Sequence, residues 1–281
     1  GTDTLVLNSA TADSATTTLT SLATTSTTVA DHTVSGIDTL NIVAKNTAAG
    51  DADVTPTVKT SLFGASTVNV TATNLDADAT SGDVVVNLTG LGSEALTVTA
   101  TAGATSGSDV ILALTKTDAS ATNTTQALTL NGALASLTVN ATTGTGVAGG
   151  VETLSITGTG TTNSIASLVA LDTTTLNLNS ASGKAIAITS IDTVNGTDAN
   201  SVTAADQKAA AFVINATGAA GNVTLGSSSG AFRADLDQKA SITLGTGTNA
   251  VYFGDATALA DTVVATAGSA DTVYINDFGG T

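Results

Sequence analysis

Residues 127–139 read ALTLNGALASLTV, and two segments within them, Ala127-Leu-Thr-Leu130 and Ser136-Leu-Thr-Val139, each alternate apolar with small or polar residues. A period of two residues is typical of β-strands that bury one face. The two segments start nine residues apart. This stretch therefore predicts two short strands joined by a turn.

The same alternation recurs from Thr4 to Ile275, separated by clusters of Gly, Asn, Asp, Ser and Thr that favour turns. Strand starts at Ile242 and Val251 are also nine residues apart, and Val251 to Thr262 is eleven. Steps near nine residues predict a parallel β-solenoid with two strands per coil. The step of 28 residues from Thr39 to Thr67 departs from this spacing and predicts irregular inserted loops.

The expected fold class is all-β. A β-sandwich is the alternative, because it also uses short strands at steps of about 8 to 12 residues. Aromatic residues make up only 2% of the chain, whereas sandwich cores usually contain large rings, so the solenoid is favoured. Two segments, 163–171 and 204–211, could form short helical turns.

Composition argues against several classes of function. The chain has 281 residues, 23 acidic and 7 basic side chains and a formal net charge of −16, which disfavours nucleic acid as a partner. It lacks Cys, and the single histidine, His32, lies in a Thr-rich segment without a recognisable catalytic arrangement. We therefore expect no enzyme, no transmembrane helix and no nucleic-acid partner. The opening residue, Gly1, indicates a piece of a longer chain.

The sharpest local motif lies near the C-terminus. Residues 244–252, LGTGTNAVY, partly match the calcium-binding nonapeptide G-G-x-G-x-D-x-U-x, in which glycines turn backbone carbonyls inward and the acid adds charge. Residues 266–278 resemble a second, degenerate copy. The candidate Ca²⁺ ligands are Asn249, Asp255, Asp261, Asp271 and Asp277, with Asp198, Asp235 and Asp237 as further candidates. Solvated turn residues are the alternative interpretation of each position.

Several phrases resemble one protein family. Residues 161–178, TTNSIASLVALDTTTLNL, followed by AIAITS at 185–190, look like a segment of the surface-layer (S-layer) proteins of Gram-negative bacteria of the Caulobacter type. The phrases SGIDTLNI at 35–42 and GGVETLSI at 149–156 are similar to recurring phrases of the same proteins. These proteins are related to the repeats-in-toxin group of secreted calcium-binding proteins.

The resemblance implies a right-handed parallel β-solenoid, type I secretion, an extracellular location at the cell surface and a structural role in a Ca²⁺-dependent two-dimensional lattice of identical copies. It also implies anchoring to lipopolysaccharide through parts of the parent chain outside these residues. Residues 1–230 would then be the lattice-forming solenoid, and 231–281, where five of the seven aromatic residues lie, a degenerate calcium-repeat β-roll or cap. An adhesin or biofilm stalk, and a carbohydrate-active β-helix enzyme, are the alternatives.

Overall fold

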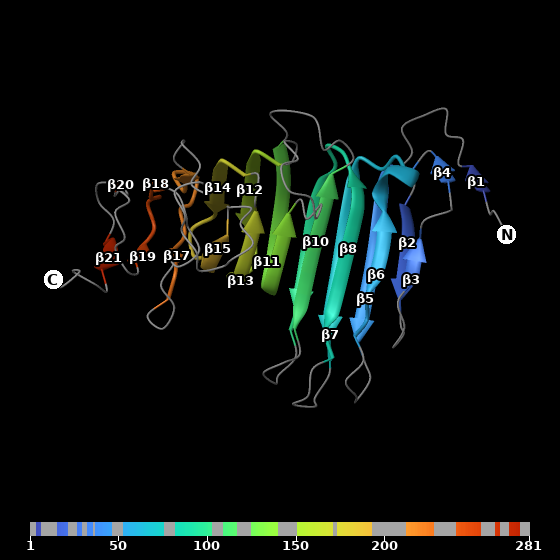
Figure 1. The fold of residues 1–281 in the computed structure, drawn as a ribbon, viewed down its shortest axis with the longest axis horizontal. Coiled ribbons are helices and arrows are strands. Elements are labelled where there is room, and N and C mark those ends of the chain that lie inside the picture. Colours follow the sequence, from blue (N-terminus) through green and yellow to red (C-terminus); the bar gives the residue numbers. More distant parts are fainter. Residues whose placement is uncertain are drawn as a thin grey trace, which may run out of the picture.

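The protein is described by a computed structural model that covers residues 4–6, 16–21, 27–29, 33–35, 37–46, 53–75, 82–102, 109–116, 125–139, 151–170, 173–192, 212–227, 240–253, 262–264 and 270–275. The strands follow one another along the long axis of the molecule, from the N-terminal end to the C-terminal end (Figure 1). Within the described residues the one helix is a short 3-10 turn, η1 (Thr60–Leu62). No helix in those residues has the length and apolar character needed to cross a membrane.

Two long parallel sheets make up the structure. Sheet 1 contains β2 (Thr16–Ser21), β5 (Thr39–Asn46), β7 (Thr67–Asn74), β9 (Ala95–Thr101), the first part of β11 (Thr125–Val139), β12 (Thr153–Gly158), β14 (Thr175–Ser180), β16 (Phe212–Asn215), β18 (Ala240–Thr243) and β20 (Thr262–Val264).

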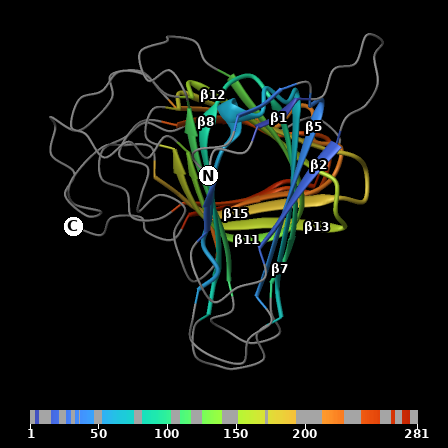
Figure 2. The same cartoon turned by 90° about the vertical axis from the view of Figure 1, so that its right-hand side faces the viewer.

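Sheet 2 contains β3 (Thr27–Val29), β6 (Pro56–Lys59), β8 (Val84–Leu91), β10 (Val110–Lys116), the second part of β11, β13 (Thr162–Ala170), β15 (Ala185–Asp192), β17 (Val223–Leu225), β19 (Ala250–Phe253) and β21 (Thr272–Ile275). A separate pair joins β1 (Thr4–Val6) to β4 (Thr33–Ser35). Viewed along the stack, β5 and β8 lie on opposite flanks (Figure 2).

From β5 onward the chain visits the two sheets in strict alternation, and each strand pairs in parallel with the strand one full coil away. This pattern confirms the predicted all-β parallel solenoid and excludes the sandwich alternative for the described strands, since sandwich sheets are antiparallel. The nine residues from Ala127 to Ser136 are the step from sheet 1 to sheet 2 within β11.

The length of one coil varies. Thr39 lies directly opposite Thr67, so the 28-residue step is one whole coil, ten residues longer than two nine-residue steps. Among the described coils of sheet 1, the shortest runs 21 residues from Ser241 to Thr262, and the longest runs 38 from Thr175 to Val213. Longer connecting segments account for the difference, as the predicted inserted loops require.

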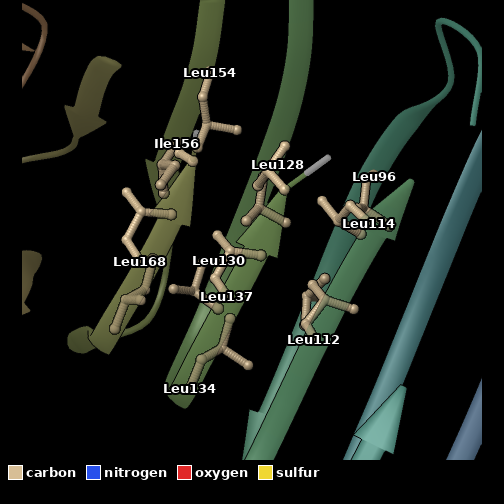
Figure 3. Close-up of a cluster of buried hydrophobic side chains, with 14 of the residues drawn as sticks. Leu96, Leu112, Leu114, Leu128, Leu130, Leu134, Leu137, Leu154, Ile156 and Leu168 are labelled. Atoms are coloured by element: carbon tan, nitrogen blue, oxygen red, sulfur yellow. The ribbon is translucent and has the colours of Figure 1, made fainter. Parts of the chain in front are cut away.

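The core consists of columns of aliphatic side chains that stack from coil to coil. One column runs through Leu40, Val68, Leu96, Leu128, Ile156 and Leu178, all at most 1% exposed. Figure 3 shows leucines of both sheets, among them Leu112 and Leu130, packed in the space between the strands. Burying each such side chain contributes about 1.5–3 kcal/mol, so these columns are the main source of stability.

Segment 163–171 is not helical. Asn163–Ala170 lies in β13, where the buried positions Ile165 and Leu168 are three residues apart. The same three-residue step occurs at Leu134 and Leu137 in β11 and at Ile188 and Ile191 in β15, and these residues pair across the coils. The alternation of buried and outward positions is therefore interrupted at the same place in all three strands. The resulting three-residue step between buried side chains resembles helical spacing in the sequence. Segment 204–211 lies outside the described residues.

Pairing continues across the composition change after residue 230. β16 pairs with β18, and β17 pairs with β19, so both sheets extend from one side of this position to the other. The division into two modules at residues 230 and 231 stays a prediction.

Candidate cation site

The partial calcium motif forms the corner between β18 and β19, where the chain passes from sheet 1 to sheet 2. Asn249 is 1% exposed and points into this corner. Its Nδ2 donates to the carbonyl oxygens of Gly245 and Gly247, each at 3.0 Å, and its Oδ1 accepts from the backbone N–H of Val223 at 2.9 Å. The carbonyls therefore face inward, as the motif predicts, and they meet the amide of Asn249.

The glycines of this corner have a steric role. A Cβ at Gly245 would lie 2.1 Å from the carbonyl oxygen of Ala219, and one at Gly247 would lie 2.2 Å from that of Gly221. Both contacts are with backbone atoms of the preceding coil, which cannot move aside without breaking the stack. The close approach of two coils is therefore sufficient to explain the glycines.

Asp271 occupies the matching corner one coil further on. Its Oδ1 accepts from Asn249 twice, from the backbone N–H at 3.3 Å and from Nδ2 at 2.8 Å. Its Oδ2 is buried and has no hydrogen-bond partner among the residues that the structure describes. A buried carboxylate oxygen without a partner is costly unless a donor or a cation compensates it. Among the candidate ligands that the structure describes, Asp271 is therefore the one with a buried oxygen still available.

The structure brings two of the eight candidate ligands together, Asn249 and Asp271. The other six, Asp198, Asp235, Asp237, Asp255, Asp261 and Asp277, lie outside the described residues and stay predictions. Within the described part of the chain, no three carboxylate or imidazole side chains converge on one point that could hold a metal ion.

A second acidic feature was missed by the sequence analysis. Asp53, Asp83 and Asp109 stack in three successive coils and are called here the aspartate column. The backbone N–H of Asp83 donates to Oδ1 of Asp53 at 3.0 Å, and that of Asp109 donates to Oδ1 of Asp83 at 3.1 Å. The sequence signal was present, because each of these aspartates directly precedes a valine that begins a paired segment: Val54, Val84 and Val110.

The column places like charges close together. Burial raises the pKa of the Asp83 carboxyl above its usual value of 3.8, and the neighbouring charges of Asp109 and Asp53 raise it further, against the lowering effect of the backbone hydrogen bond from Asp109. Two buried amides brace the same corner, since Asn46 and Asn74 both donate from Nδ2 to the carbonyl oxygen of Gly82. Hydrogen bonds therefore hold the column in place, and repulsion between its ionised carboxylates destabilises it.

At the corner that follows β10, where the chain returns from sheet 2 to sheet 1, the side chain of Lys116 provides a positive charge. The Lys116 ammonium donates to the carbonyl oxygens of Gly92 and Thr125. Burial lowers the pKa of Lys116, and the nearby charge of Glu94 acts in the opposite direction. Beside it, the buried Oε1 of Gln126 has no hydrogen-bond partner within the described ranges. An ammonium group thus joins carbonyls from two successive coils.

Comparison with known proteins adds no assignment: no family model, curated protein or solved structure matches this chain.

Proposed function

We propose that this chain is a structural domain of a bacterial surface layer, in which copies assemble into a two-dimensional lattice that depends on Ca²⁺. The observation that carries the calcium part is the buried Oδ2 of Asp271, which has no hydrogen-bond partner in the described part of the chain. Hard cations take oxygen ligands, and a buried carboxylate oxygen that still lacks a partner is a donor of the kind they require. Asp271 would hold the ion, which would supply the positive charge that this carboxylate lacks.

The net charge of −16 supports the lattice part of the proposal. Identical acidic molecules repel one another at short range, so dense packing requires counterions between them. Divalent ions shared between carboxylates meet this need. The elongated stack of coils provides long faces along which copies can pack (Figure 1).

The calcium proposal is tested by thermal unfolding with and without Ca²⁺. At a free Ca²⁺ concentration 100 times the dissociation constant, one site stabilises the folded state by about 2.7 kcal/mol. Excess EGTA should remove this gain, and Mg²⁺ should not replace Ca²⁺. Asp271→Asn is the informative variant, because it reproduces the amide already present at Asn249 and should fold while losing the Ca²⁺-dependent gain. An unchanged calcium titration in this variant removes Asp271 from the proposal.

The lattice proposal is tested by electron microscopy of the full-length protein in Ca²⁺. Two-dimensional crystals that disperse in EGTA support a surface layer. Isolated filaments in both conditions would contradict it and support the adhesin or biofilm stalk, for which a single stack of coils is equally suited.

A further inference from the structure

Sheet 1 presents an outer face that is almost free of charge. In the described strands from β5 to β18, every outward position is uncharged except Lys45 near the end of β5. One row of this face, called here the central row, runs in register through six strands and contains Asn41, Asn69, Thr97, Thr129, Thr157 and Asn179. Each of these side chains is half-buried, and Asn69 donates to Asn41 at 2.9 Å.

The described carboxylates lie away from this face. Asp38, Glu94 and Glu152 directly precede β5, β9 and β12 at one edge of sheet 1, and the aspartate column lies at the corner that leads into sheet 2. Because the chain carries a net charge of −16, two copies repel least where no carboxylates oppose each other. The outer face of sheet 2 is less suited, since Lys59 and Asp192 lie in its strands.

The spacing of the rows makes this face complementary to itself. Parallel strands repeat about every 4.8 Å, so a second copy presents side chains at the same interval, and the two sets can interdigitate. The six strands of the central row cover roughly 25 Å by 20 Å, about 500 Å² per copy and about 1,000 Å² in total. This area is at the lower end for specific contacts, which suits a weak contact repeated many times in an assembly.

One charge pair fixes the orientation. Asp38 directly precedes β5 (Thr39–Asn46), and Lys45 lies near the opposite end of this strand. A two-fold axis parallel to the long axis of the stack makes the strands of the two copies antiparallel and places β5 opposite β5. Each Lys45 then meets the Asp38 of the other copy, and the pair occurs twice.

We infer that the outer face of sheet 1 docks a second copy of this chain, face to face, about a two-fold axis parallel to the solenoid axis. The inference deepens the proposed self-assembly by naming its contact surface, and this contact requires no metal ion. It can therefore be measured in EGTA, where the proposed calcium-dependent lattice is absent.

The charge pair provides the first test, by sedimentation equilibrium in EGTA at low salt. Lys45→Glu and Asp38→Lys should each weaken dimerisation about 5- to 10-fold, through loss of the pairs and new repulsion. The double variant restores opposite charges across the interface and should recover most of the affinity. Additive losses in the double variant would overturn the proposed orientation. Unchanged melting temperatures serve as the folding control.

A cross-linking test uses the absence of native cysteine in the chain. Thr129 and Thr138 are half-buried, outward residues of the same strand β11, one on each sheet. Thr129 lies near the middle of the sheet 1 face, so its symmetry mate lies close by. With a short bis-maleimide, Thr129→Cys should give at least about fivefold more covalent dimer than Thr138→Cys at equal maleimide reactivity.

The outcomes separate this inference from the proposed function. Equal or greater cross-linking at position 138, or a protein that stays monomeric at all concentrations, would overturn the docking face. A Ca²⁺-dependent lattice that forms without any preference for position 129 would overturn the inference alone. Cross-linking at position 129 without a lattice in Ca²⁺ would support the inference and contradict the proposed function.

Discussion

Single buried asparagine side chains stabilise the corners between the two sheets by hydrogen bonding to the backbone. Asn163 and Asn249 each use the side-chain oxygen to accept from backbone N–H groups and the nitrogen to donate to carbonyls. A corner leaves backbone groups that the strand ladders cannot pair, and one amide side chain satisfies several of them. This explains why polar residues less than 2% exposed persist inside an otherwise aliphatic core.

Asn163→Ala tests this role. The substitution removes the partner of the Gly160 N–H at 3.0 Å and of the carbonyls of Gly160 and Ala185, at 3.0 and 2.8 Å. We expect a loss of about 2–4 kcal/mol in the free energy of unfolding, measured by urea denaturation. Asn177→Ala is the control, since Asn177 is half-exposed and donates to Ser155 alone in the same row. Its cost should stay below about 1 kcal/mol.

Gly132→Ala tests the tight bend within β11. Gly132 has φ of +117°, and an added Cβ would lie 1.9 Å from the carbonyl oxygen of Ala100 in the preceding coil. Gly183 also has a positive φ, +75°, but nothing lies within 4 Å of its Cβ position. Gly183→Ala should therefore cost only about 1–2 kcal/mol of backbone strain. A comparable loss in both variants would show that the contact between coils does not limit Gly132.

At the scale of strands, register brings together residues that are far apart in the sequence. In the aspartate column, Asp83 and Asp109 are 26 residues apart in the sequence, and Asp53 and Asp83 are 30 apart. They become neighbours because β8 pairs with β10 and because Val54 pairs with Val84. The sequence analysis missed the column because its members come from different coils and share no local spacing. Asn249 stood out in the sequence because Gly245 and Gly247 mark its turn locally, and its binding of Ca²⁺ together with Asp271 stays a prediction.

Asp83→Asn should stabilise the protein at neutral pH. The raised pKa of Asp83 means that the folded state binds its proton more tightly than the unfolded chain, so ionisation costs stability as the pH rises. The gain should be less than about 1 kcal/mol, since solvent screens this partly exposed group, or up to about 3 °C in melting temperature.

The pH profile distinguishes this cause from a general effect of charge removal. The stabilisation by Asp83→Asn should vanish as the pH falls below the ordinary carboxyl value of 3.8. Glu152→Gln, at the other edge of sheet 1, removes one charge outside the column and is the control. An equal gain in both variants would assign the effect to net charge.

At the scale of the whole molecule, much of the architecture could be predicted because each coil buries aliphatic side chains at alternating positions of its strands. Alternation at Ala127–Leu130 and Ser136–Val139 correctly indicated β-structure and the step between sheets, but the two segments form one continuous strand, β11, rather than two strands joined by a turn. The full coil was harder to recognise, since connecting segments change its length from 21 to 38 residues. The helical interpretation of 163–171 failed because Ile165 and Leu168 follow a strand irregularity shared by neighbouring coils.

The charge of the whole chain predicts a strong effect of salt. At −16 the folded molecule repels itself, and raising NaCl from 20 to 200 mM shortens the screening length from roughly 20 Å to about 7 Å. We expect the melting temperature to rise across this range. The same series at pH 4, where many carboxylates are protonated, should show a smaller rise, and an equal rise at both pH values would exclude repulsion between carboxylates as the cause.

The parallel pairing of each strand with the next coil also determines how the protein bears tension. Bonds between coils point along the long axis, so a pull at the two ends loads them a few at a time, and coils would peel away in succession at low force. A pull along the strands would instead shear whole ladders at once. An assembly of aligned stacks would therefore extend easily along the stack axis and resist extension along the strands.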